Sequence, residues 1–305
     1  MENNLVTSTG SVNYGEMAKF MGIPQTSGDA EKKTSQLARV KLLHKPIMGQ
    51  QEVAGKMKNM EIVEAGSYSV TLPDERIVYV SKLNIRPFMQ RYMYKRFVAS
   101  KDPDSGKRGD FVKTVMADSL NNDLHDNSGG FNCGKPAGWI QDFKALPSKT
   151  QDLIKQIKRV RAIFGMANLN GGVVVEGGTV KDVEDMTIPI IYEVDNRTSF
   201  KTSGEPFNLL AKKRHLPIQH SIDFTSKANP LPNGDSYYTV VADLSSDTID
   251  IADDDPKHLQ DFSDWVTNYN SYIMEQYNEK SSAKMDEDDQ ELVEGFIDSD
   301  ELSEG

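Results

Sequence analysis

The stretch Ile85-Arg-Pro-Phe-Met-Gln-Arg-Tyr-Met-Tyr-Lys-Arg-Phe97 interleaves bases with aromatic and apolar residues. This alternation and the aromatic content predict a β-strand. One face of the strand would carry Arg86, Phe88, Gln90, Tyr92, Tyr94 and Arg96, and the other Pro87, Met89, Arg91, Met93, Lys95 and Phe97. We expect the first face to be a binding surface and the second to be partly core. The alternative is an amphipathic edge strand whose rings pack in the protein and whose bases are only solvated.

Other strand-like segments lie on both sides of this stretch. They cover residues 37–43, 61–72, 75–83, 111–116, 160–169, 173–194, 216–224 and 237–244. Helical spacing of apolar residues begins near Pro147 and after Pro256, and it covers part of residues 198–214. The pattern predicts a mainly β fold with a few helices, of the α+β class. We expect an elaborated barrel resembling the five-stranded oligonucleotide-binding barrel.

Composition divides the chain into four segments. Residues 1–36 are rich in Ser, Thr, Gly and Asn, which predicts a flexible N-terminal arm. Residues 37–252 are expected to form the β-rich nucleic-acid-binding core, and residues 253–284 a helix packed on that core. Residues 285–305 are too acidic to bury themselves, so we expect a disordered tail. A short amphipathic turn at residues 14–22 could dock on a neighbouring copy, which would allow self-association through the arm.

Charge is unevenly distributed along the chain. The net charge is −11, yet no Lys or Arg follows Lys284, whereas ten Asp or Glu residues do. Residues 1–250 carry a net charge of +3 when Lys and Arg are counted against Asp and Glu. A mildly basic body therefore carries an acidic tail, and this asymmetry says more about partners than the overall charge.

Several features concern the compartment. No apolar run approaches the roughly 18 residues of a membrane span, so no membrane interaction is expected. The N-terminus lacks the basic start and apolar stretch of a secretory signal. The single cysteine, Cys133, excludes an internal disulfide framework and suits a reducing compartment. The sequence thus predicts a soluble, cytoplasmic protein.

Four residues of the polar stretch 121–138 are of metal-ligand types: Asp123, His125, Asp126 and Cys133. A structural zinc site normally needs four nitrogen or sulfur ligands, often in paired spacing, and the chain has no second cysteine. Gly134-Lys135 is followed by Pro136 rather than by Ser or Thr, so the segment does not match a phosphate-binding loop. We therefore predict no metal site, no cofactor and no catalytic residue.

Basic residues recur in segments that are far apart in the sequence, and a groove that follows a phosphate backbone requires them to converge on one face. With the aromatic residues of the first stretch, they form the predicted nucleic-acid site: Arg86, Phe88, Arg91, Tyr92, Tyr94, Lys95, Arg96, Lys107, Arg108, Lys158, Arg159, Arg161, Lys212, Lys213 and Arg214. Cations neutralise phosphates and rings stack on unpaired bases, so this mixture favours single strands.

The layout of an N-terminal arm, a basic-aromatic β-rich body and an acidic C-terminus resembles the single-stranded DNA-binding proteins of tailed bacteriophages. The resemblance implies DNA binding without sequence specificity in phage DNA replication and recombination, in the host cytoplasm. It also implies that the tail competes with DNA for the groove and recruits replication or recombination proteins. The tail residues concerned are Asp286, Glu287, Asp288, Asp289 and Phe296.

Two alternatives stay open. A virion or scaffold protein would use the arm and the tail for assembly. A metal-dependent nucleic-acid enzyme would use acids such as Asp118, Asp123 or Asp126 as ligands, although no paired-carboxylate motif supports it.

Overall fold

The computed structural model describes residues 37–53, 56–100 and 109–300, without the side chains of residues 51–53, 57 and 283–300. These residues all belong to one of the two units into which the chain divides. The predicted N-terminal arm, residues 1–36, lies outside the described residues, and so do Lys107 and Arg108 of the predicted site.

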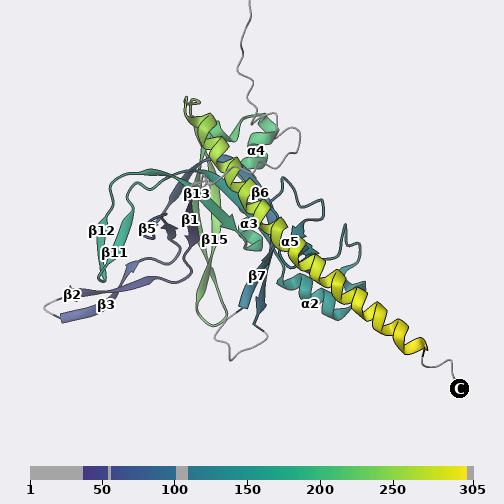
Figure 1. Ribbon diagram of the computed structural model, residues 1–305. Coiled ribbons are helices and arrows are strands. Elements are labelled where there is room, and N and C mark those ends of the chain that lie inside the picture. Colours follow the sequence, from purple (N-terminus) through teal and green to yellow (C-terminus); the bar gives the residue numbers. More distant parts are fainter. Residues whose placement is uncertain (1–36, 54–55, 101–108, 301–305) are drawn as a thin grey trace, which may run out of the picture. The chain divides into compact units, whose positions relative to one another are not determined.

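Eleven strands form one sheet (Figure 1). Its pairing path runs through β12 (Thr179–Asp182), β11 (Val173–Glu176), β5 (Ile77–Val80), β4 (Tyr68–Thr71), β1 (Ala38–Leu42), β13 (Thr187–Val194), β10 (Lys158–Asn168), β6 (Leu83–Ala99), β14 (His220–Pro230) and β15 (Ser236–Thr248). Beside this path, β7 (Gly109–Lys113) pairs with the last residues of β6. Two hairpins form separate small sheets, β2 (Ile47–Val53) with β3 (Lys56–Val63) and β8 (His125–Asp126) with β9 (Gly130–Phe131).

Helices are few in the described part of the chain. The α-helices are α2 (Ser148–Gln156), α3 (Arg197–Thr202), α4 (Glu205–Lys213) and α5 (Asp255–Asp300), and 3₁₀ turns are formed by Asn132–Gly134, Phe143–Ala145 and Pro217–Gln219. α3 begins where the Asn196 side chain accepts hydrogen bonds from the amides of Thr198 and Ser199. α4 has Pro206 in its first turn, where a missing amide costs no helical hydrogen bond. The fold is mixed α/β and mostly strands, so the prediction of many strands and few helices is confirmed.

The predicted oligonucleotide-binding barrel is not confirmed, because the described strands do not close on themselves. β12 and β15 stand at opposite ends of the pairing path. β1 is inserted between β4 and β13, and it pairs in parallel with β13. The 17-residue β6 pairs with both β10 and β14. Local alternation identifies strands but not their distant partners, so it cannot tell an extended sheet from a closed one.

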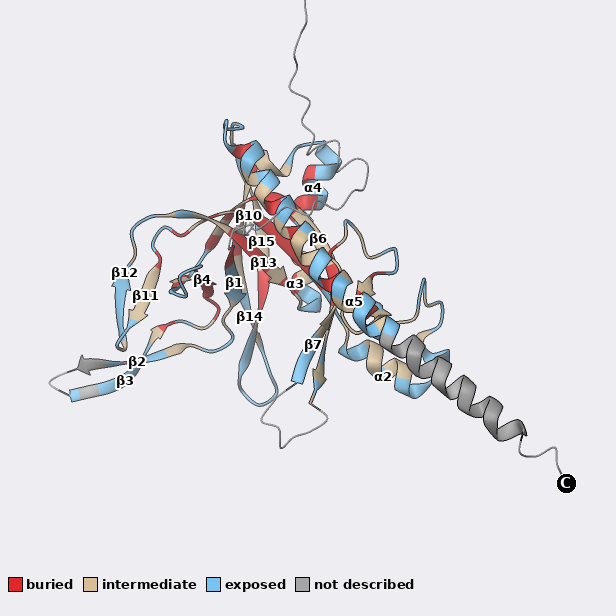
Figure 2. Cartoon of the chain, viewed as in Figure 1, coloured by how far each residue is buried: buried red, intermediate tan, exposed pale blue. Residues whose placement is uncertain are grey.

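The sheet carries apolar side chains on both faces, because successive residues of a strand point to opposite sides. Phe164 of β10 packs in a cluster with Phe262 and Val266 of α5. The preceding residue, Ile163, belongs to a larger cluster on the other face, which includes Phe207 of α4. Figure 2 shows buried residues gathered in the central strands and in the part of α5 that crosses them.

The regular alternation predicted for the opening stretch is wrong at one position. The register between β10 and β6 shifts between Phe164 and Gly165, and Phe88 is the extra residue of a bulge. Phe88 and Met89 consequently both pack beneath α5. A Cβ on Gly165 would lie 2.3 Å from the Arg86 carbonyl oxygen, so the bulge requires glycine there. Beyond the bulge, one face carries Arg91, Met93, Lys95 and Phe97, and the other carries Gln90, Tyr92, Tyr94 and Arg96.

α5 begins at Asp255, close to the start expected from Pro256. Its backbone continues as helix to Asp300, which differs from the disordered tail predicted for residues 285–305. Residues 285–300 contain no proline and a single glycine, and extending an existing helix costs less than nucleating a new one. Among the described helices, none combines the length and the apolar character that crossing a membrane requires.

Candidate nucleic-acid interface

Two members of the predicted site hold α5 against the sheet. Arg86 donates from its two terminal nitrogens to the Asp255 carboxylate at 2.7 and 2.9 Å, and from Nε to the Ile218 carbonyl at 2.7 Å. Phe88 is 9% exposed, and its ring centroid lies 5.6 Å from that of Phe262. Because these groups are engaged in the contact between strand and helix, neither is free to bind a phosphate or a base.

Tyr92 and Arg161 are paired across neighbouring strands and form an internal contact. Arg161 Nη1 donates to the Tyr92 hydroxyl at 2.9 Å and to Gln90 Oε1 at 2.6 Å. The guanidinium lies 4.9 Å from the ring centroid of Phe200 on α3. Arg161 is 7% exposed, and burial lowers its pKa. This cation therefore stabilises the contact of α3 with the sheet rather than facing a ligand.

Tyr94 is also enclosed, contrary to the predicted stacking role. Its side chain is 5% exposed and packs with Leu124 and Cys133, and burial raises its pKa. Arg96, on the same face of β6, is partly buried, and its Nε has no hydrogen-bond partner among the described residues. Arg91, on the opposite face, pairs with the exposed Asp118 at 2.9 Å. Tyr94 cannot stack on a base in this arrangement.

Five further predicted bases are exposed, at two places. Lys158 and Arg159 stand at the start of β10, and Lys212, Lys213 and Arg214 stand at the end of α4. α4 ends there because Arg214 adopts a left-handed conformation with φ 58°. A nucleic-acid role for these five residues stays a prediction.

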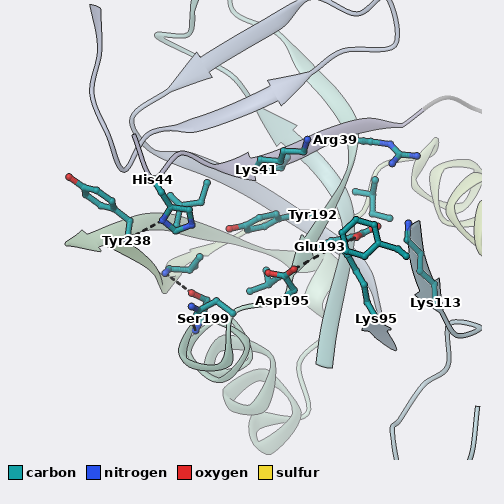
Figure 3. A pocket seen from close by; sticks show the side chains of 17 residues that line it. Arg39, Lys41, His44, Lys95, Lys113, Tyr192, Glu193, Asp195, Ser199 and Tyr238 are labelled. Carbon is teal, nitrogen blue, oxygen red and sulfur yellow. Dashed lines mark hydrogen bonds and ion pairs between the residues drawn. The ribbon is translucent and has the colours of Figure 1, made fainter. Parts of the chain in front are cut away.

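A cleft of about 370 Å³ is lined by residues of β1, β6, β7, β13 and β15 and by Ser199 of α3 (Figure 3). Ile191 of the lining belongs to the cluster beneath α5, whereas Tyr192 and Val240 belong to the cluster on the other face. The charged groups of the lining come from several strands: Arg39 and Lys41 of β1, Lys95 of β6, Lys113 of β7, Glu193 of β13 and Asp195 directly after it. Four cations thus face two carboxylates, so the cleft is electropositive and attracts anions.

The two carboxylates lie among the lysines (Figure 3). Lys95 Nζ is 3.5 Å from Glu193 and 3.8 Å from Asp195, and Lys158 Nζ is 3.1 Å from Asp195. The Lys158–Asp195 pair is 56% and 31% exposed, so it contributes about 1 kcal/mol or less. The two Lys95 contacts are longer than a direct hydrogen bond. An incoming phosphate can therefore replace the carboxylates at low energetic cost.

At one side of the cleft, β6 and β7 form a basic-aromatic ladder of Lys95, Phe97, Phe111 and Lys113. Lys95 pairs with Lys113, and Phe97 pairs with Phe111 two residues further along. All four side chains share one face because of the strand alternation. The two rings are 45% and 40% exposed and meet at a centroid distance of 5.2 Å. Lys95 Nζ lies 4.9 Å from the centroid of the Phe111 ring.

Another wall of the cleft is held by hydrogen bonds to β15. The amide of Tyr238 donates to His44 Nδ1 at 3.2 Å, and the amide of Val240 donates to the Ser199 hydroxyl at 3.0 Å. β15 is an end strand of the path, so side chains here satisfy amides that no neighbouring strand pairs. Tyr192 completes the lining, and burial raises its pKa, so its phenol stays neutral.

Sequence reasoning placed Lys95 in the predicted site but missed the other charged residues of the cleft. Arg39 and Lys41 lie on the exposed side of β1, within a segment whose alternation predicts a strand. The alternation in the sequence therefore indicated that these two cations are exposed. Bringing β1 near β6 depends on β13 and β10, which lie between them in the sheet, and the sequence does not reveal that order.

The acids considered as metal ligands make contacts within the protein. Asp123 accepts a hydrogen bond from the Asn132 amide group at 2.6 Å. Asp126 is fully buried and accepts from the Cys133 amide at 2.9 Å. Within residues 37–53, 56–100 and 109–300, no three His, Cys, Asp or Glu side chains are arranged to hold a metal ion.

Comparisons of the chain with models of known families, with curated proteins and with solved structures find no match. The cleft and the basic-aromatic ladder are therefore the basis for assigning a function.

Proposed function

We propose that this protein binds single-stranded nucleic acid, DNA in the first place, through the cleft and the basic-aromatic ladder and without sequence specificity. The observation that carries the proposal is the exposed Phe97–Phe111 pair beside Lys95 and Lys113 on one face. Lysines bind phosphates, and unpaired bases stack on exposed aromatic rings. A duplex offers phosphates but keeps its bases stacked, so the ladder favours single strands.

Binding would exchange the ion partners of the lysines. Phosphate would replace the carboxylates of Glu193 and Asp195 as the ion partner of Lys95 and Lys158. The ion pairs that it would replace are weak. Arg39 can add a two-pronged contact, because guanidinium geometry matches two phosphate oxygens. Affinity should therefore fall with rising salt, as expected when cations displace condensed counterions.

The acidic C-terminus belongs to the same proposal. The ten Asp and Glu residues after Lys284 would compete with phosphate for the cleft, most strongly at low salt. Once displaced by DNA, the segment could engage replication or recombination proteins of a bacteriophage, with Phe296 as an apolar contact. This part of the proposal follows from charge and from the resemblance to phage single-stranded DNA-binding proteins.

The direct test is a titration of labelled oligothymidylate, a duplex of equal length and the matching RNA at two salt concentrations. We expect the single strand to bind more tightly than the duplex. Lys113→Gln should weaken binding and reduce the log–log salt slope by about 0.7, the value for one phosphate contact on a single strand. The matched control is Lys181→Gln on β12, a lysine paired with Glu176 at the other end of the sheet path.

Two outcomes would contradict the proposal. Absence of oligonucleotide binding together with salt-insensitive oligomers would favour an assembly protein. Cleavage of the oligonucleotide that depends on magnesium would favour a nucleic-acid enzyme.

A further inference from the structure

We infer that Trp139 is a second base-stacking position for the same nucleic-acid strand, on the side of β6 that carries Tyr94. This inference rests on the proposed function and extends its binding surface. Trp139 is 88% exposed, the highest exposure among the large apolar side chains that the structure describes. A solvent-exposed tryptophan presents a large, flat apolar ring. A nucleobase is one of the few flat ligands that can stack on such a ring.

The position of Trp139 follows from its neighbours. Lys135 Nζ donates to the Gly138 carbonyl at 3.2 Å, and this hydrogen bond holds the backbone of the residue that precedes Trp139. The same Nζ lies 5.9 Å from the ring centroid of Tyr94. Tyr94 and Lys95 are adjacent in β6 and point to opposite faces. Trp139 therefore follows a backbone held on the Tyr94 side, whereas Lys95 lines the cleft.

Exposed cations lie between the cleft and Tyr94. Lys158 and Arg159 are consecutive residues at the start of β10, so they point to opposite sides of the sheet. Lys158 pairs with Asp195 of the cleft. Arg159 pairs across strands with Tyr94 and acts electrostatically on its phenol. A strand leaving the cleft at Lys158 thus meets Arg159 and then Lys135 before it reaches Trp139.

The surroundings of Trp139 favour a base over an apolar protein segment. Between Asn132 and Ala145, Trp139 is the one large apolar side chain that is exposed. A docking groove for a helix would need several apolar anchors in a row. Residues 135–149 instead carry Lys135, Lys144 and Lys149 against one acid, Asp142. A single ring among cations is the pattern of a stacking position on a phosphate path.

Tryptophan fluorescence can test this inference, because the chain contains only two tryptophans. Trp265 stacks on Tyr269 at 5.7 Å against the core, so Trp265→Phe leaves Trp139 as the reporter. Oligothymidylates of about 4 and about 16 nucleotides span the usual site sizes. We expect both to raise the anisotropy of a label on the oligonucleotide, and the longer one alone to quench Trp139. Trp139→Ala should weaken binding of the longer oligonucleotide by about 5- to 140-fold and leave the short one unchanged.

The two readouts separate this inference from the proposed function. Anisotropy that reports binding of the longer oligonucleotide without quenching of Trp139 would overturn the stacking position and leave the cleft standing. No change in anisotropy with either oligonucleotide would overturn the proposed function itself. Should Trp265→Phe fail to fold, the wild-type signal minus that of Trp139→Phe gives the same answer, because Trp139 makes no core contact.

Discussion

The two ends of β6 have similar composition, but one end is covered by a helix and the other is exposed. Near its start, Arg86 and Phe88 are covered by α5 and bind Asp255 and Phe262. Near its end, Lys95 lines an open cleft and Phe97 is 45% exposed. A base next to a ring therefore signals binding only where no other element packs on it. The same chemistry that attracts a phosphate and a nucleobase also attracts a helix that offers a carboxylate and a phenyl ring.

The largest effect is expected at the covered end. Arg86→Ala would leave the Asp255 carboxylate, whose side chain is 3% exposed, without its ion pair. Breaking a buried pair by removing one partner typically costs about 3–5 kcal/mol. Urea unfolding should show this loss. Arg91→Ala is the control, because Arg91 pairs with Asp118, whose side chain is 86% exposed, and should cost about 1 kcal/mol or less. A small cost for Arg86→Ala would mean that α5 is held mainly by its apolar contacts.

At the open end, Phe111→Ala should act on binding rather than on folding. Loss of a stacking ring weakens single-strand binding by about 1–3 kcal/mol per base, with little change in salt slope. Phe131→Ala is the matched control, since Phe131 is similarly exposed at 44% but packs against His125 and Tyr277. Oligonucleotide titration at two salt concentrations distinguishes the outcomes. If both variants bind like the wild type, the ladder is not the stacking surface.

The smallest effect concerns the acids between the cations of the cleft. Glu193→Gln removes a carboxylate 3.5 Å from Lys95 and so frees that lysine for phosphate. We expect tighter single-strand binding at low salt, by about 1 kcal/mol or less, and no gain at high salt. Glu176→Gln on β11, which also removes an acid paired with lysine, should change nothing. Weaker binding by Glu193→Gln would show that the carboxylate positions Lys95 rather than competes for it.

Part of the fold and of the site could be predicted from local patterns. The strand of residues 85–97 and the start of α5 near Pro256 follow from periodicity and from a helix start signal, which depend on neighbours in the chain. The exposed face of β6 could not be predicted. Phe88 forms a bulge that shifts the alternation, and it does so because Gly165 on β10 leaves room for it. Nothing in the sequence indicates that Phe88 and Gly165 lie opposite each other in the sheet.

The sequence by itself determined the strand-rich character, the asymmetry between a basic body and an acidic terminus, and the mixture of rings and cations. These properties depend on residue type and on short spacing. Only the tertiary structure decided which rings are exposed and which cations meet. It placed β1 two strands away from β10 and three from β6, so that Arg39 and Lys41 share a cleft with Lys95. The physical reason is that burial and charge convergence arise from contacts between segments distant in the chain, which no local pattern encodes.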